Sequence, residues 1–231
     1  MTETLLLTGA IRPSFPVQRS DPYTRLIDYL CAIRRWLDVP TLEHVIYCDA
    51  SGCHIPENVF GSEKFESLSF DASEHARQYE AGRAEAETLA FILEKSRFQF
   101  DTFYKCTGRL FVKNFDELSH EMEEKQNIPL FLRPWYIEEW ADTRFFWMTV
   151  QAFKEWIAPR IGELTGHGYH GHVIESLFHE YISNARIFSE PRLVGYGGHG
   201  NNLYEEDFFE QEKQCAEEMI QKFGPQTFFC D

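Results

Sequence analysis

Two cationic side chains flank a hydroxyl and a glycine in the segment Lys105-Cys106-Thr107-Gly108-Arg109. The residues on either side are mostly apolar, which is typical of a strand that enters a protein core. A cation buried in such a strand is costly unless an anion lies beside it. A nucleotide diphosphate would supply that anion, since Gly108 allows close backbone approach and Arg109 can donate two parallel hydrogen bonds to phosphate. The alternative, which stays open at this point, is an ion pair with a carboxylate of the chain itself.

Two acidic residues in the second half of the chain are candidates for a general base. Asp142 stands before Thr143 and Arg144, at the start of an aromatic segment that would shield its carboxylate from water. Glu175 lies in a segment of helical periodicity whose apolar side chains occupy the opposite face. Either carboxylate could take the proton of an attacking hydroxyl, as an inverting group transfer requires. The alternative for Asp142 is an ion pair with Arg144 that closes a loop.

Histidines surround the second of these acidic residues. His170 and His172 precede Glu175, and His179 follows it, so that three of the four groups are spaced to share one helical face. The spacing is not that of a zinc hydrolase, and no cysteine accompanies it, so no metal centre is predicted here. Arg144, His170 and His172 are instead candidates for contacts with an acceptor molecule. Exposed polar side chains at a helix start are the alternative reading of the histidines.

Two further sites lie where predicted elements begin or end. Asp49 follows an apolar run, and a carboxylate at a strand end can accept hydrogen bonds from ribose hydroxyls or a base N–H. An Asx-turn that only closes the strand is its alternative. Gly82-Arg83 is predicted to open a helix, whose N-terminus and added positive charge would suit a phosphate. Glu85 in the same turn could equally balance the helix dipole.

The elements that must position these residues predict one α/β domain. Residues 4–10 form an apolar run that predicts a buried strand, and Asp21-Pro22 predicts the start of an amphipathic helix that Pro40 stops. A second strand follows at 42–48. Strand, helix and strand in this order form the right-handed unit of a parallel sheet, whose ligand edge lies at the carboxyl ends of the strands. Further strands are expected at 67–70, 101–112 and 144–148, and helices at 80–96, after Asn114, after Thr149, at 172–185 and at 205–222.

Composition limits the class of protein. The chain has 231 residues and a formal net charge of −15, and a surface of this sign repels nucleic acid and anionic lipid. No run of about 18 apolar residues is present, so no transmembrane helix is expected, and the first residues do not resemble a signal peptide. The six cysteines are scattered without a zinc spacing and are expected to be free thiols. A cytoplasmic protein is predicted, with a peripheral place at the inner face of a membrane left open.

Six segments, quoted in chain order, carry a family resemblance: TLLLTGAIRP, DPYTRLIDYLCAIRRWL, HVIYCDASG, YKCTGRLFVKN, ADTRFFWM and HVIESLFHEYI. They resemble the GT-A-type glycosyltransferases of bacterial surface polysaccharide assembly, the enzymes of capsule and lipopolysaccharide. The resemblance implies a Rossmann-like GT-A fold, with a mostly parallel central sheet flanked by helices. It also implies a nucleotide-sugar transferase domain over 1–190, with a donor half to about 115 and an acceptor half from about 116. Residues 191–231 would add a glycine-rich loop and a helical C-terminal appendage to the same domain.

The resemblance implies a reaction and roles for particular residues. A sugar would move from a nucleotide-activated donor to a carbohydrate acceptor, without nucleic acid and with a homodimer left open. Thr8 and Gly9 would hold the nucleoside together with Asp49, and Asp142 or Glu175 would be the base. With the phosphate candidates above, the donor-binding set becomes Thr8, Gly9, Asp49, Arg83, Lys105 and Arg109.

The chain departs from the family pattern in its metal site. GT-A enzymes usually bind a divalent metal through an Asp-x-Asp triplet, and no such triplet occurs in this sequence. Cationic residues in place of the metal, or a CMP-sugar donor that needs none, are two explanations. No metal ligand is therefore predicted, and dependence on Mn²⁺ or Mg²⁺ stays open. A nucleotidyltransferase or phosphotransferase on a similar sheet, and a non-catalytic interaction protein, are the competing functions.

Overall fold

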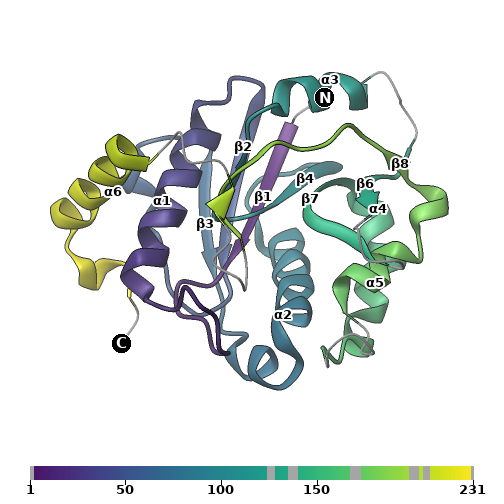
Figure 1. Cartoon of the computed structure of the whole chain (residues 1–231), viewed down its shortest axis with the longest axis horizontal. Coiled ribbons are helices and arrows are strands. Elements are labelled where there is room, and N and C mark those ends of the chain that lie inside the picture. Colours follow the sequence, from purple (N-terminus) through teal and green to yellow (C-terminus); the bar gives the residue numbers. More distant parts are fainter. Residues whose placement is uncertain are drawn as a thin grey trace.

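The computed structural model describes residues 3–123, 128–134, 140–166, 173–197, 203–204 and 209–229. A seven-stranded sheet with the order β3-β2-β1-β4-β7-β6-β8 forms its centre (Figure 1). The strands are β1 (Glu3–Gly9), β2 (Leu42–Asp49), β3 (Phe65–Ser69), β4 (Thr102–Thr107), β6 (Leu130–Pro134), β7 (Ala141–Thr149) and β8 (Arg186–Ile187). All neighbouring pairs are parallel except those that β7 makes with β4 and β6. This confirms the predicted, mostly parallel sheet.

A second, three-stranded sheet lies beside the first. It has the order β10-β9-β5, with β5 (Leu110–Val112), β9 (Leu193–Tyr196) and β10 (Leu203–Tyr204) antiparallel. The helices are α1 (Pro22–Asp38), α2 (Ser73–Lys95), α3 (Phe115–Glu123), α4 (Val150–Ala152), α5 (Ile174–His179) and α6 (Phe209–Phe223). Shorter helical turns are η1 (Glu57–Val59), η2 (Phe153–Ile157), η3 (Ala158–Glu163), η5 (Ile182–Asn184) and η6 (Pro225–Thr227). No helix among the described residues is long and apolar enough to cross a membrane.

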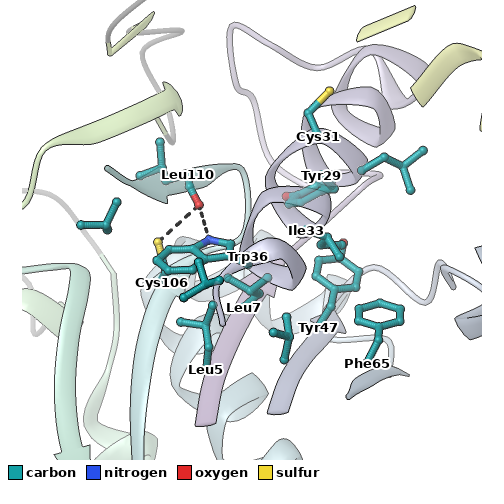
Figure 2. Close-up of a cluster of buried hydrophobic side chains, with 14 of the residues drawn as sticks. Leu5, Leu7, Tyr29, Cys31, Ile33, Trp36, Tyr47, Phe65, Cys106 and Leu110 are labelled. Carbon is teal, nitrogen blue, oxygen red and sulfur yellow. Dashed lines mark hydrogen bonds between the residues drawn. The ribbon is translucent and has the colours of Figure 1, made fainter. Parts of the chain in front are cut away.

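Helices cover both faces of the main sheet. In Figure 1 α1 and α6 lie on one side of it, and α2 and α5 lie on the other. Leu5 and Leu7 of β1 join a core with α1 and α6, while Leu6 joins a second core with α2 and α5. Figure 2 shows part of the first core, in which Trp36 Nε1 donates to the carbonyl of Leu110 at 2.9 Å. Because both faces of β1 are buried, its sequence is continuously apolar rather than alternating.

The first helix follows the sequence prediction. Asp21 caps α1, since its carboxylate accepts from the backbone N–H of Thr24 at 2.7 Å, and Pro22 occupies the first position. The helix ends at Asp38, before Pro40. The start and the stop of this helix are both confirmed.

The predicted helix start at Gly82 is wrong. The helix α2 begins at Ser73, whose backbone N–H donates to the side chain of Asp71 at 2.9 Å. Gly82 therefore lies inside the helix and offers no free N–H groups to a phosphate. Its small size serves packing, because a Cβ atom there would lie 3.3 Å from the backbone nitrogen of Ile174.

Two other predicted elements are divided in the structure. The segment 101–112 leaves the main sheet after Thr107 and continues in the second sheet as β5. The turn is tight, since a Cβ at Gly108 would lie 2.9 Å from the carbonyl oxygen of Thr8. The helix expected over 172–185 is six residues long, and η5 follows it as a separate turn.

Candidate functional site

A cleft of about 610 Å³ opens at the carboxyl ends of β1, β2 and β4. Other parts of its walls come from the loop after β1, α1, one face of α2, the start of β7, the start of α5 and Tyr204 of β10. This edge is the one at which open α/β sheets bind ligands. The volume suits a ligand of the size of a nucleotide or small molecule.

The floor of the cleft contains an ion pair whose lysine is buried. Lys105 of β4 has no exposed surface, and its ammonium group contacts Glu85 Oε1 of α2. The same ammonium donates to the carbonyl of Thr143 at 2.6 Å, and Thr8 Oγ1 donates to Glu85 Oε1 at 3.0 Å. Lys105 thus lies beneath the cleft rather than on its wall. Lys105 therefore forms the internal ion pair that the sequence left open as the alternative to a ligand.

Glu175 faces the same cleft from the first turn of α5. Thr143 Oγ1 donates a long hydrogen bond of 3.5 Å to Glu175 Oε1. Burial raises the pKa of Glu175 to about 7, and the negative charge of Glu85 acts in the same direction. Within the described parts of the chain, Glu175 makes no ion pair with a lysine or arginine. It is therefore a carboxylate that can gain and lose a proton near neutral pH.

Asp142 and Arg144 line the cleft as a pair. Arg144 Nε and Nη2 donate to the two carboxylate oxygens of Asp142 at 2.8 and 2.7 Å. The backbone N–H of Arg144 adds a third bond at 3.0 Å, and its Nη1 donates to the hydroxyl of Tyr204 at 2.5 Å. Both oxygens of Asp142 are thus occupied. The structure contains the ion pair that was its alternative role.

Two buried arginines also line the cleft. Arg25 of α1 and Arg109 after β4 are 6% and 3% exposed. Arg109 Nη2 donates to the carbonyl of Gly197 at 2.9 Å, and its Nη1 lies 3.6 Å from Asp28 Oδ2. Arg19 binds the same aspartate through two bonds of 2.5 and 2.7 Å. Burial lowers the pKa of Arg109, and the positive charge of Arg25 contributes.

The predicted nucleoside residues divide into two groups. Thr8 and Gly9 line the cleft, whereas Asp49 is fully buried behind it. The carboxylate of Asp49 accepts from the backbone N–H groups of Ile11 and Ser51, both at 2.8 Å, and from the hydroxyl of Tyr47 at 2.8 Å. The bond to Ser51 is the Asx-turn that the sequence left open. Asp49 thereby fixes the loop after β1 against the end of β2.

The remaining predicted residues lie elsewhere. Arg83 is outside the cleft wall, where its Nε donates to Glu87 Oε1 at 3.1 Å and its guanidinium stacks on the ring of Tyr79. His170 and His172 lie outside the described residues. The structure thus brings together Thr8, Gly9, Arg109, Asp142, Arg144 and Glu175.

Sequence reasoning assigned no site role to Glu85 or Arg25, although both line the cleft. Glu85 was treated only as a balance for a helix dipole, because the partner that defines its role, Lys105, is distant in the sequence. The sequence does contain a local signal that could have identified Arg25. A cation near the N-terminus of a helix is unfavourable to the helix dipole, and α1 has no acidic residue in its first turn.

The cleft residues offer no carboxylate cluster for a metal. Among the residues that the structure describes, no three His, Cys, Asp or Glu side chains converge in a metal-binding arrangement. Lys105 holds Glu85, and Arg144 holds Asp142. Two of the three carboxylates that line the described cleft are therefore held by cations of the chain, and Glu175 is the third.

Neither a family model nor a curated protein sequence matches this chain. The galactosyltransferase LgtC, solved with donor and acceptor sugar analogues, aligns with a TM-score of 0.51 at 8% identity over 96% of each chain. The fold is GT-A-like. A cytidylyltransferase from Leptospira borgpetersenii aligns with a TM-score of 0.49 at 9% identity over 99% of this chain and 97% of that one. The inositol-1-phosphate CTP transferase from T. maritima aligns at 0.48 and 11% identity over 100% and 98%.

Proposed function

We propose that this protein is a glycosyltransferase that moves a sugar from a nucleotide-activated donor to a carbohydrate acceptor. The observation that carries the proposal is Glu175, a shielded carboxylate without an ion pair in the described residues, facing the ligand edge of a GT-A-like sheet. Such a group is suited to taking a proton from a hydroxyl at neutral pH. The sequence resemblance supports a surface polysaccharide as the acceptor class. We propose the cytoplasm as the place of reaction, as the sequence predicts.

The donor is proposed to lie beside Arg25 and Arg109. Thr8 and Gly9 would flank the nucleoside at the end of β1, in the donor half of the chain. Arg109 would face the phosphates, since a planar guanidinium group donates paired hydrogen bonds to phosphate oxygens. Arg25, whose guanidinium donates to Ala10, Arg19 and Tyr29, would add its positive charge. Their position on the cleft wall supports this role. The acceptor would then enter from the side of β7 and α5, which bears Glu175.

The proposed step is a single displacement. The acceptor hydroxyl gives its proton to Glu175 as its oxygen forms a bond to the anomeric carbon of the donor sugar. The bond from that carbon to the phosphate oxygen breaks, and the nucleotide leaves with the electron pair. Arg25 and Arg109 would stabilise the negative charge that develops on the leaving phosphate. The configuration at the anomeric carbon is inverted.

The loop after β1 favours sugar transfer over nucleotidyl transfer. A nucleotidyltransferase must hold a nucleoside triphosphate, for which successive backbone N–H groups of a glycine-rich loop are suited. Residues 10–20 contain no glycine, and Pro13 and Pro16 have no backbone N–H to donate. A ligand screen can distinguish sugar transfer from nucleotidyl transfer.

A ligand screen tests the proposed function directly. We expect one class of nucleotide sugar, among UDP-, GDP- and CMP-sugars, to raise the melting temperature of the protein in EDTA as well as in Mn²⁺. The reason is that the described cleft supplies arginines and no metal-binding carboxylate cluster. Thermal shift in both buffers, followed by detection of sugar transfer to carbohydrate acceptors, is the measurement. Stabilisation only by a nucleoside triphosphate with Mg²⁺ would indicate the nucleotidyltransferase instead.

Arg109→Lys tests the phosphate end. The variant keeps a positive charge but loses the planar donor pair, so we expect the dissociation constant of the nucleotide to rise about tenfold. Arg83→Lys, outside the cleft, is the matched control and should bind as the wild type does. Isothermal titration with the nucleotide product measures both. A fall in the melting temperature of the unliganded Arg109→Lys protein, with nucleotide affinity retained, would show a purely structural arginine.

A further inference from the structure

A continuous set of contacts joins the two carboxylates Glu85 and Glu175. Glu85 of α2 is held by the ammonium group of Lys105, which also donates to the carbonyl of Thr143 at 2.6 Å. The side chain of Thr143 then donates to Glu175 Oε1. The link crosses three elements, α2, β4 and β7, before it reaches α5. The protonation of Glu175 is therefore exposed to both charges of the Lys105–Glu85 pair.

The charged groups around Glu175 fall into two pairs. Asp142 and Arg144 of β7 form one pair, closed by two bonds between their side chains. Lys105 and Glu85 form the other, and each member acts on Glu175 with the opposite sign, the carboxylate favouring its neutral form and the ammonium its ionised form. His179 lies one turn after Glu175 on α5. These two are the titratable residues between Ile174 and His179, the bounds of that helix.

We propose that Lys105 and Glu85 are positioning residues that together set the proton affinity of the proposed base Glu175. The inference rests on the proposed function, because a general base needs a proton affinity that matches the working pH. Lys105 without Glu85 would hold Glu175 ionised and make it a weak base. Glu85 without Lys105 would hold it protonated and unable to accept a proton. The pair balances these effects.

Burial of Lys105 has a cost that this role explains. A lysine with no exposed surface loses the hydration of its charge, and a buried pair is often no more stabilising than apolar residues of the same size. Burial makes the largest contribution to the raised pKa of Glu175. Glu85 and Lys105 act on this pKa in opposite directions, and it lies at about 7. A general base works best when its proton affinity matches the working pH.

Variants of the pair test the proposal by the direction of their effects. We expect Glu85→Gln to move the acid limb of the pH profile of kcat/KM down by about one unit, and Lys105→Met to move it up by about one unit. The double variant Glu85→Gln with Lys105→Met should return close to the wild-type midpoint, because both charges are gone. Glu87→Gln is the matched control, since Glu87 lies on the same helix and pairs outside the cleft with Arg83.

A second measurement separates this inference from the proposed function. The midpoint of the Glu175 carboxyl can be followed by NMR with ¹³C-labelled glutamate, assigned with Glu175→Gln, in the absence of any substrate. Opposite shifts in Glu85→Gln and Lys105→Met support the inference, and shifts of the same sign or none overturn it. If Lys105→Met fails to fold, the other two variants still test the inference. It then requires that the Glu175 midpoint move down in Glu85→Gln and stay unchanged in Glu87→Gln. Lack of sugar transfer by the wild-type protein would count against the proposed function alone.

Discussion

Glu175→Gln should lower turnover at pH 8 by about two orders of magnitude or more, with nucleotide affinity unchanged. Glutamine keeps the shape and the hydrogen-bond acceptor of Glu175, but it cannot take a proton from the acceptor hydroxyl. In the wild-type protein turnover should rise with pH through about 7, because the carboxylate is the active form and burial raises its pKa to about 7. Initial rates of sugar transfer from pH 5 to pH 9, with nucleotide binding measured separately, check both statements.

The same substitution should stabilise the folded protein at high pH. Burial places the folded pKa of Glu175 at about 7, above its ordinary value of 4.5. The unfolded chain therefore loses this proton first, and the stability of the wild-type protein falls as pH rises from about 4.5 to about 7. Glutamine has no such loss, so at pH 8 the variant should gain up to about 3 kcal/mol in unfolding free energy, less where partial exposure screens the charge. At pH 4 the gain should vanish.

Asp142→Asn is the control for this result. Both oxygens of Asp142 accept hydrogen bonds from Arg144, so its loss should cost about 1–2 kcal/mol of stability and spare most of the turnover. Urea denaturation and initial rates measure the two effects side by side. A large loss of turnover in Asp142→Asn, with near-normal turnover in Glu175→Gln, would transfer the proposed role of base to Asp142.

The sequence predicted the sheet well because its central strands carry local signals. Residues 4–10 and 42–48 are apolar throughout, as strands buried on both faces must be, and they form β1 and β2. Asp21 and Pro22 mark a helix start by chemistry that needs no tertiary partner. Elements whose residues are specified by local structure could therefore be found from the sequence.

Elements defined by tertiary contacts were harder to predict. The first turns of α2 are polar, so their helical period has little hydrophobic contrast, and the helix start was placed too late. The helix predicted over 172–185 breaks where Tyr181 stacks on Trp156 and donates to its carbonyl at 3.1 Å. Neither contact can be predicted from the local sequence. The strands β8 and β9 are short and pair with the distant strands β6 and β5, and they were missed for the same reason. The strands β6 and β10 were also missed.

The candidate site shows the same division. The need of Lys105 for an anionic partner could be read from its apolar strand, but the choice between a ligand and Glu85 depends on how α2 packs against the sheet. Asp49 was correctly found at a strand end, yet its hydrogen-bond partners come from the loop after β1 as well as from its own turn. Sequence reasoning identified the residues with unusual surroundings, and only the packing shows what surrounds them.

Gly195→Ala should cost about 4 kcal/mol of unfolding free energy and abolish nucleotide binding at the temperature where the wild type binds. Gly195 has a φ of +113°, which side chains of L-residues rarely adopt, and a Cβ there would lie 2.2 Å from the carbonyl oxygen of Arg109. The obstacle is backbone, so relief requires that β9 separate from β5, where Gly195 pairs with Leu110.

That separation connects the stability of the second sheet to the donor end of the cleft. Arg109 immediately precedes β5, and its Nη2 donates to the carbonyl of Gly197, the residue after β9. A shift of either strand therefore moves the guanidinium from the cleft wall. Gly162→Ala is the matched control, because no atom lies within 4 Å of a Cβ built there, and it should change stability by less than about 0.5 kcal/mol. Urea unfolding and nucleotide titration of both variants provide the test. Equal stability of the two variants would mean that β9 does not hold Arg109 in place, and the donor site would then have to be supported by α1 alone.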